Sequence, residues 1–291
     1  MLKRINKKEV YSLIKNRNKN SHKGDNGHLL IVGGSIDYHG APILAGIGAL
    51  RSGVDLVTIF VPEVNFEISR AMYPDFIVKK YPGEHLTERY VDKILNYSKK
   101  CSAILIGPGI KDNEKSMEAC FEIIMKTSLP IVLDASAISV LKKVEKFPLA
   151  QSIVITPHKN EFRNLVDRDM DIDENDPKSI VFLRSIAMDL NINILLKGNP
   201  DYVVSEDGDV VLNETGNAGM TVGGTGDFLA GVVASLLAQK YDSYLAIQIS
   251  SYMVGKAGDM AYKKYGYGLM ASDLGEELAK SIQNKSFFGL L

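Results

Sequence analysis

The sequence lacks the features that mark secreted, disulfide-rich and membrane-spanning proteins. Only two of its 291 residues are cysteines, Cys101 and Cys120, and their spacing fits neither a metal site nor a redox pair. This excludes a disulfide framework and favours a reducing compartment. The N-terminus has no apolar core of the signal-peptide type, and the longest apolar run, 228–238, is too short to cross a bilayer. We therefore expect a cytoplasmic protein with no membrane partner.

An excess of charge of one sign is also missing. Lys and Arg number 34 against 35 Asp and Glu, so the net charge of −1 gives no global electrostatic case for binding nucleic acid or a membrane. One basic cluster runs from Lys3 to Lys23, but Val10, Leu13 and Ile14 interrupt it at helical spacing. That spacing indicates a solvated segment rather than a binding tail. Hydrophobic residues make up 45% and charged residues 24%, which is usual for a soluble globular protein.

Two common nucleotide-binding motifs are absent. The sequence contains no G-x-G-x-x-G and no G-x-x-x-x-G-K-[ST]. The first is the phosphate-binding turn of dinucleotide folds, and the second is the loop of Walker-type nucleotide folds. Both of these folds are therefore disfavoured.

Short apolar runs alternate with helical patterns along most of the chain. The runs rich in β-branched residues are expected to be strands, and most are apolar throughout, as in strands covered on both faces: 28–32, 56–61, 103–106, 131–133, 153–155 and 194–196. Helical patterns lie between and after them, at 42–52, 88–99, 114–127, 137–143, 178–190, 227–239, 243–262 and 272–283. A hairpin is expected where 202–204 and 210–212 flank a turn. This alternation predicts one α/β domain over residues 1–291, a three-layer α/β/α sandwich with a mostly parallel central sheet.

Polar or glycine-rich turns follow five of the expected strands. They lie at 32–35, 107–109, 134–136, 156–161 and 197–201. Ligands of open parallel sheets bind beyond the carboxyl ends of the strands, where such turns gather. Each turn alone is a weak signal, since a lone histidine such as His158 is often a helix cap or a surface residue. Their recurrence after so many strands favours a ligand site.

The most informative segment is 216–227, which runs directly into an apolar helix. It contains five glycines, so its backbone can approach a ligand closely and adopt positive φ. Amides at a helix N-terminus form a site for an anion, and here a carboxylate, Asp227, follows within the first turn. An anion site beside a carboxylate suits a base that removes a proton while charge develops on a transferring phosphoryl group. A simple N-capped helix would explain Asp227 but not Gly223, Gly224 and Gly226 in front of it.

Gly223-Gly-Thr-Gly-Asp227 resembles the G-G-[ST]-G-D motif of the ribokinase-like superfamily. Within it, the chain most closely resembles the ADP/ATP-dependent NAD(P)H-hydrate dehydratases, collinearly over about residues 22–275. The matching segments are 22–27 (family K-G-D-x-G), 33–35, 38–45, 107–109, 156–161, 197–198, 216–219 and 271–274. The family usually reads L-D-A-D-A-L where this chain has Ser136 in place of the second carboxylate, which leaves the role of that carboxylate open.

The resemblance implies a metabolite-repair lyase that uses ADP or ATP to dehydrate hydrated NADH or NADPH. Asp227 would be the catalytic base, with an anion hole at Gly223, Gly224, Thr225 and Gly226. Nucleotide contacts would come from Lys197, Gly198, Asn199, Pro200, Asp201 and Gly226, and contacts to the hydrate from Ala41, Gly109, His158 and Asp227. It also implies Mg²⁺ with unassigned protein ligands, a homotetramer, and an epimerase carried by a separate protein.

Three rival functions stay open at this point. A ribokinase-like vitamin or sugar kinase would use Asp227 in the same way, since phosphorylation is common to both reactions. A non-catalytic nucleotide sensor could keep the fold and the ligand loops, although the base is present. A dehydrogenase that binds the intact dinucleotide is disfavoured by the missing glycine motif. The sequence does not distinguish ADP from ATP, nor the hydrate of NADH from that of NADPH.

Overall fold

A single ten-stranded sheet forms the centre of the computed structural model, which describes residues 2–283. Its order is β1-β10-β9-β8-β7-β6-β5-β2-β3-β4. Neighbouring strands are parallel except that β9 is antiparallel to β8 and β10. The strands are β1 (Lys3–Arg4), β2 (His28–Val32), β3 (Leu56–Pro62), β4 (Ile77–Tyr81), β5 (Ala103–Ile106), β6 (Ile131–Leu133), β7 (Ile153–Ile155), β8 (Asn193–Leu196), β9 (Asp201–Val204) and β10 (Val210–Asn213).

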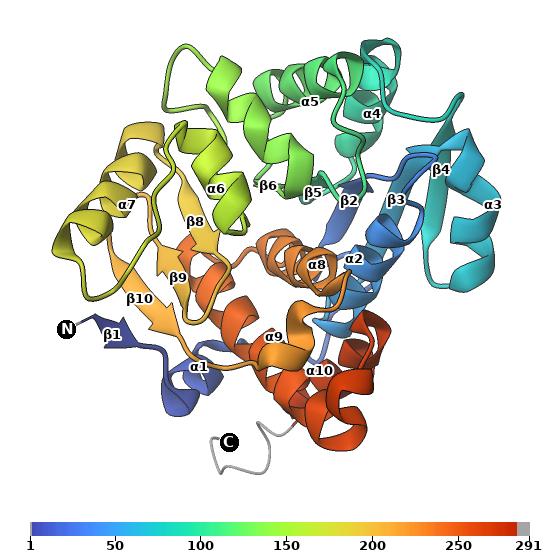
Figure 1. The fold of residues 1–291 in the computed structure, drawn as a ribbon. Helices are drawn as coiled ribbons and strands as arrows, with labels where there is room; N and C mark the ends of the chain where they lie inside the picture. Colours follow the sequence, from blue (N-terminus) through green and yellow to red (C-terminus); the bar gives the residue numbers. More distant parts are fainter. Residues whose placement is uncertain (1, 284–291) are drawn as a thin grey trace.

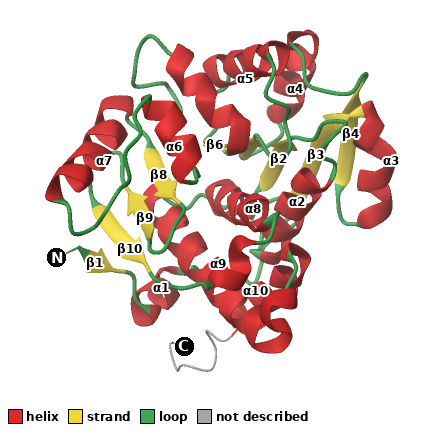
Figure 2. Cartoon of the chain, viewed as in Figure 1, coloured by secondary structure: helices red, strands yellow, loops and turns green. Residues whose placement is uncertain are grey.

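Helices cover both faces of this sheet (Figures 1 and 2). One layer contains α1 (Lys7–Leu13), α2 (Gly40–Arg51), α8 (Thr225–Ala238), α9 (Ser243–Tyr265) and α10 (Leu274–Gln283). The other contains α4 (Val91–Ser98), α5 (Glu114–Lys126), the 3₁₀ helix η2 (Ala135–Lys143), α6 (Lys159–Val166) and α7 (Pro177–Leu190). The helix α3 (Glu63–Met72) lies beside the edge strand β4.

Strand β2 shows why the predicted strands are apolar throughout. Leu29 and Ile31 belong to the core beneath α2 and α8, whereas Leu30 and Val32 belong to the core beneath α4 and α5. Successive side chains of a strand point to opposite faces, so a sheet covered on both faces needs apolar residues at every position. All five residues of β2 are accordingly buried.

The predicted α/β/α sandwich with a mostly parallel sheet is confirmed, and so is the antiparallel hairpin. Three expectations need correction. The segment 137–143 lies in a 3₁₀ helix rather than an α-helix, and the helix expected at 88–99 is a short 3₁₀ turn, η1 (Glu88–Tyr90), followed by α4. The solvated N-terminal segment contributes β1, where Arg4 forms ion pairs with Glu174 and Glu214. The edge strand β4 and the helices α3 and α6 were not predicted.

Close packing of α2 against α8 brings the starts of both helices to the same end of the molecule. A side chain at Gly231 of α8 would lie only 1.9 Å from the Ala45 carbonyl oxygen of α2, so the contact requires glycine. Helix α8 runs back from the carboxyl ends of the parallel strands, which puts its N-terminus at the edge where ligands bind. Within residues 2–283, no helix has the length and apolar content needed to cross a membrane.

Candidate active site

Lys197 lies at the centre of a partly buried group of charges at the carboxyl ends of β6, β7 and β8. It follows β8 directly, and its Nζ lies 3.2 Å from Asp134 Oδ1 and 4.0 Å from Glu161 Oε2. Thr156 Oγ1 donates to the same Asp134 oxygen at 2.7 Å. Burial lowers the pKa of Lys197, but the carboxylates of Asp134 and Glu161 outweigh it and leave the pKa raised. The ammonium group is therefore charged and held in place.

Asp227 lies in the first turn of α8, where the sequence predicts it, and interacts electrostatically with the same charges. Burial and then the negative charge of Asp134 raise the pKa of its carboxyl group, which reaches about 7 against the opposing charge of Lys197. A carboxyl group with a pKa near neutral pH is well matched to general-base catalysis. The position of Asp227 and its raised pKa are compatible with the predicted role of base.

The loop in front of Asp227 owes its shape mainly to Gly224. This residue caps α8 with φ at +98°, a left-handed conformation that disfavours other residues, and a Cβ atom there would lie 2.4 Å from Leu44 Cδ1. Within 216–227 only Gly216 and Gly224 have positive φ, so Gly223 and Gly226 are not required for backbone conformation. A Cβ atom at Gly226 would lie 3.2 Å from Lys197 Nζ, whereas the space beside Gly223 is open. The small residues therefore leave room next to the ammonium group.

A pocket of about 570 Å³ opens beside this group of charges. Five of the predicted nucleotide-binding residues line it, namely Lys197, Gly198, Asn199, Asp201 and Gly226, together with His158 and Thr225. Its apolar wall comes from α8 and α9 and includes Leu229 and Val254. A pocket with polar groups at one end and apolar side chains at the other suits a nucleotide, with phosphates near Lys197.

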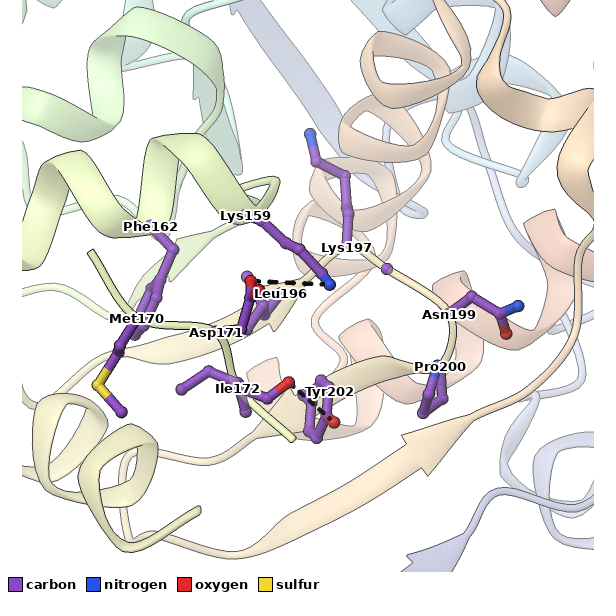
Figure 3. Close-up of a pocket in the computed structure, with 11 residues that line it drawn as sticks. Lys159, Phe162, Met170, Asp171, Ile172, Leu196, Lys197, Asn199, Pro200 and Tyr202 are labelled. Atoms are coloured by element: carbon purple, nitrogen blue, oxygen red, sulfur yellow. Dashed lines mark hydrogen bonds and ion pairs between the residues drawn. The ribbon is translucent and has the colours of Figure 1, made fainter. Parts of the chain in front are cut away.

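Pro200 is the exception among the predicted nucleotide-binding residues. It lines a neighbouring hollow of about 30 Å³ together with Lys159 and Asp171, whose side chains approach each other to 3.8 Å. Figure 3 shows Asn199 and Pro200 on the turn that leads into β9, while Lys197 directs its ammonium group away from this hollow. The hollow is too small for a nucleotide, so Pro200 belongs to the turn without lining the larger pocket.

Asp201 stabilises the turn at 197–201 through hydrogen bonds. Its Oδ1 accepts a hydrogen bond from the Gly198 amide at 2.9 Å, and its Oδ2 accepts one from Asn213 Nδ2 at 3.0 Å. Burial raises the pKa of Asp201 to about 6, against these hydrogen bonds and the charge of Lys197. Its carboxylate thus fixes the Gly198 backbone beside the pocket.

The predicted hydrate-binding residues fall into two places. Ala41, in the first turn of α2, and Gly109 are adjacent, since a Cβ atom at Gly109 would lie 3.1 Å from Ala41 Cβ and 3.0 Å from Tyr38 Cβ. His158 lies with the nucleotide-side residues and lines the pocket. It also caps α6, because its Nδ1 accepts hydrogen bonds from the amides of Asn160 and Glu161 at 3.1 Å.

Sequence reasoning did not single out Asp134, Thr156 or Glu161 as site residues. All three lie in the polar turns after β6 and β7, so those turns were the available signal. Asp134 meets Thr156 and Lys197 through hydrogen bonds that join residues 22 and 63 positions apart in the sequence, so the pattern of a single turn does not reveal them. Of the two carboxylates in the family pattern L-D-A-D-A-L, this chain keeps the first, Asp134, and has Ser136 at the place of the second. Asp134 forms the ion pair with Lys197.

The site offers little to a metal ion by itself. Among residues 2–283, no group of three or more His, Cys, Asp or Glu side chains is placed to hold a metal. Asp134 and Glu161 are the carboxylates beside Lys197, and both already accept hydrogen bonds, from Thr156 and from the His158 amide. Mg²⁺ commonly keeps several waters and binds through one or two carboxylates plus phosphates. The residues present fit that mode of binding and not a dedicated cage.

Comparison with known proteins agrees with this geometry. The chain is 35% identical over 196 residues to the ADP-dependent (S)-NAD(P)H-hydrate dehydratase of Nitrosopumilus maritimus, covering 67% of each protein. The crystal structure of the ADP/ATP-dependent NAD(P)H-hydrate dehydratase of Bacillus subtilis, co-crystallised with ATP/Mg²⁺, matches with a TM-score of 0.84 and 26% identity, over 98% of this chain and 99% of the other. A ribokinase-like superfamily protein of Enterococcus faecalis shares the fold, with a TM-score of 0.84 and 24% identity over 97% and 96% of the two chains.

The first curated relatives are longer than this chain, which spans 36% and 37% of their length. The model of the NAD(P)H-hydrate dehydratase family matches residues 29–280, a range that includes the Lys197 group of charges, the predicted anion loop (223–226) and Asp227. The fold is ribokinase-like, as expected. The chain therefore belongs to the NAD(P)H-hydrate dehydratase family.

Proposed function

We propose that this protein dehydrates hydrated NADH or NADPH at the expense of ADP or ATP and so restores the reduced cofactor. The observation that carries the proposal is Asp227 at the start of α8, close to Lys197 and to a pocket of nucleotide size. Its pKa of about 7 suits a base at neutral pH. The family and its dehydratase relatives support the choice of substrate.

The first step overcomes a poor leaving group. Hydroxide departs with difficulty from a neutral carbon centre, so the ring hydroxyl of the hydrate is phosphorylated first. Asp227 takes the hydroxyl proton as the oxygen attacks the terminal phosphorus of the nucleotide, and the bond from that phosphorus to the bridging oxygen breaks. The amides of Gly223, Gly224, Thr225 and Gly226 stabilise the charge on the transferring group, and Lys197 offsets charge on the phosphates.

The second step removes phosphate. The nicotinamide ring nitrogen donates its electron pair toward the carbon that bears the phosphate, the carbon–oxygen bond breaks, and a proton leaves the neighbouring ring carbon. The products are NADH or NADPH, inorganic phosphate, and AMP when ADP is the donor or ADP when ATP is the donor. The oxygen of the original hydroxyl leaves with the phosphate.

Binding roles follow from the two sides of the site. Lys197, Gly198, Asn199, Asp201 and Gly226 would hold the nucleotide, with Pro200 shaping the turn. Ala41 and Gly109 would meet the hydrate, and His158 would reach it from the turn after β7. Bound Mg²⁺ would neutralise phosphate charge, with Asp134 and Glu161 holding it through its waters.

A direct test is incubation of the protein with hydrated NADH, Mg²⁺ and ADP or ATP, followed through the absorbance of the reduced nicotinamide. The absorbance should return only when both hydrate and nucleotide are present. The alternative, a vitamin or sugar kinase, shares the first step only. It would take over if hydrated NADH were untouched while a phosphorylated vitamin or sugar accumulated.

The setting of the protein belongs to the same proposal. We place it in the cytoplasm, as one domain over residues 1–291, in a homotetramer, with hydrate epimers interconverted by an epimerase. The longer relatives are named bifunctional repair enzymes, which supports a second activity on the same substrate. Light scattering coupled to gel filtration tests the assembly, and a monomer would contradict it.

A further inference from the structure

A second cavity of about 760 Å³ lies at the end of the molecule opposite Asp227. It surrounds the C-terminal end of α8, and the 14 residues of that helix put it roughly 20 Å from the catalytic end, at about 1.5 Å per residue. The volume falls within the range of roughly 300–1,000 Å³ that is usual for small-molecule sites. None of the residues assigned to the proposed reaction lines it.

The interior walls of this cavity are apolar and come from three helices. They consist of Val232 and Leu236 of α8, Ile249 and Met253 of α9, and Leu278 and Ile282 of α10. Val232, Leu236, Ile249, Met253 and Leu278 are also part of the main hydrophobic core, so these walls are rigid. An apolar body placed here would be removed from water, which is favourable in proportion to its buried area.

The rim of the cavity is basic and rich in hydrogen-bond donors. It is formed by the segment after α1, which contributes Lys15, Asn16, Arg17, Asn18 and Ser21. Lys15 and Arg17 face Asp25 in the described lining, and Arg17 also pairs with Asp55. An adjoining hollow of about 390 Å³, which Asp55 also lines, adds Lys19 and Lys23 to the same side, so the described basic residues around the two openings outnumber the acidic ones.

Contacts with the rest of the fold hold this rim in place. Lys15 Nζ donates to the Lys240 carbonyl oxygen at 2.9 Å and lies 4.3 Å from the centroid of the Tyr241 ring. Arg17 lies 3.3 Å from Asp55 and donates to the Gly53 carbonyl oxygen. Its guanidinium has five N–H donors in a planar fork, so it can hold Asp55 and a second anion together.

The K-G-D-x-G segment at 23–27, which the active site does not use, completes this rim. Asp55 accepts hydrogen bonds from the amides of Gly24 and Asn26 at 3.0 Å each and from Asn26 Nδ2. The same carboxylate thus ties Arg17 and this turn to the start of β3. The segment therefore shapes the entrance to the second cavity and not the catalytic end.

We propose that this cavity binds an amphipathic carboxylate, with its apolar body between α8, α9 and α10 and its charged head at Lys15 and Arg17. The apolar walls select the body, and the net positive rim selects an anionic head over a neutral one. Charge-assisted hydrogen bonds to the head would be worth about tenfold or more in affinity.

Decanoate is a suitable probe, and the chain offers a clean reporter because it contains no tryptophan. Ile282→Trp places a single indole at the cavity. Val181→Trp places one at an exposed position of α7 and is the matched control. Decanoate, below its micelle concentration and with saturating ADP and Mg²⁺, should shift the emission of the first variant and leave the second unchanged. Decanol should bind at least about tenfold more weakly.

The charge requirement is tested by Lys15→Gln and Arg17→Gln, and each variant should bind decanoate about tenfold more weakly or worse. The control is Lys99→Gln, an exposed lysine that directly follows α4. If Ile282→Trp fails to fold, the rise in melting temperature that decanoate produces in the wild-type chain supplies the same comparison. The proposal is overturned if decanoate has no effect, if Lys99→Gln weakens binding as much as the rim variants, or if ADP displaces the probe.

Discussion

At Asp227, one proton determines whether the proposed reaction begins. Asp227→Asn keeps the size and hydrogen-bonding reach of the side chain but cannot accept the hydroxyl proton, so turnover should fall at least about 100-fold. ADP binding, measured by calorimetry, should be largely retained because the anion loop is intact. Turnover within a few-fold of wild type, in a variant shown to be folded, would remove Asp227 from the role of base.

The pKa of Asp227 makes a second prediction at the same residue. Its carboxyl group must be ionised to act, so kcat/KM should rise with pH through about 7. Asp134 raises that pKa through its negative charge, so Asp134→Asn should move the rising limb to lower pH. The pH profiles of the two proteins measure this directly. An unmoved limb would mean that another group sets the profile.

Ionisation of Asp227, which should raise kcat/KM, should lower the free energy of unfolding. The pKa of Asp227 rises from 3.8 to about 7 on folding, so the folded protein binds this proton more tightly than the unfolded chain does. This contribution favours folding below pH 4 and is lost as the pH rises through 7. Asp227→Asn should therefore be more stable than wild type at pH 8, by denaturant titration. A less stable variant at pH 8 would show that the ionised carboxylate is well solvated or paired.

At the scale of an element, the start of α8 depends on its capping glycine. Gly224→Ala should lower the free energy of unfolding by about 1–2 kcal/mol, because alanine is strained at φ +98° and its Cβ displaces Leu44. It should also weaken ADP binding. Gly223→Ala is the matched control, since the space there is open and φ is not positive, and it should change stability by less than about 0.5 kcal/mol. Equal effects at both positions would contradict this account.

The elements also differ in how far the sequence predicts them. Strands β2, β5, β6 and β7 have the predicted bounds because buried parallel strands are continuous apolar runs. Strand β4 was missed because it lies at the edge of the sheet and its Lys79 and Lys80 are exposed, which breaks the run. The segment 137–143 has helical spacing in either an α-helix or a 3₁₀ helix, so its pattern does not distinguish them.

The site divides in the same way. The place of Asp227 at the start of a helix behind a glycine-rich loop could be predicted because 216–227 is one continuous segment. The ion pair between Lys197 and Asp134 could not, since the two residues lie 63 positions apart and meet only when β6 and β8 align across β7. The raised pKa of Asp227 has the same origin, because burial and the charges of distant residues produce it.

At the scale of the whole molecule, the two cysteines report on the integrity of the core. Burial raises the pKa of both thiols, Cys101 and Cys120, to about 12. Because the thiolate is the reactive form, neither should react with an aromatic disulfide reagent at pH 8 in the native protein, and both should react in denaturant. Rapid reaction of one thiol in the native state would show that α4 or α5 opens locally.

The central claim, that phosphorylation precedes loss of phosphate, is tested most directly by following the hydroxyl oxygen. Hydrated NADH prepared with ¹⁸O in its ring hydroxyl is turned over with ADP and Mg²⁺ in unlabelled water, and the phosphate is analysed by mass spectrometry. The account predicts NADH, AMP and phosphate in equal amounts, with one ¹⁸O in each phosphate. Phosphate without ¹⁸O, whose fourth oxygen comes from water, or a labelled phosphoester that accumulates without NADH, would contradict it.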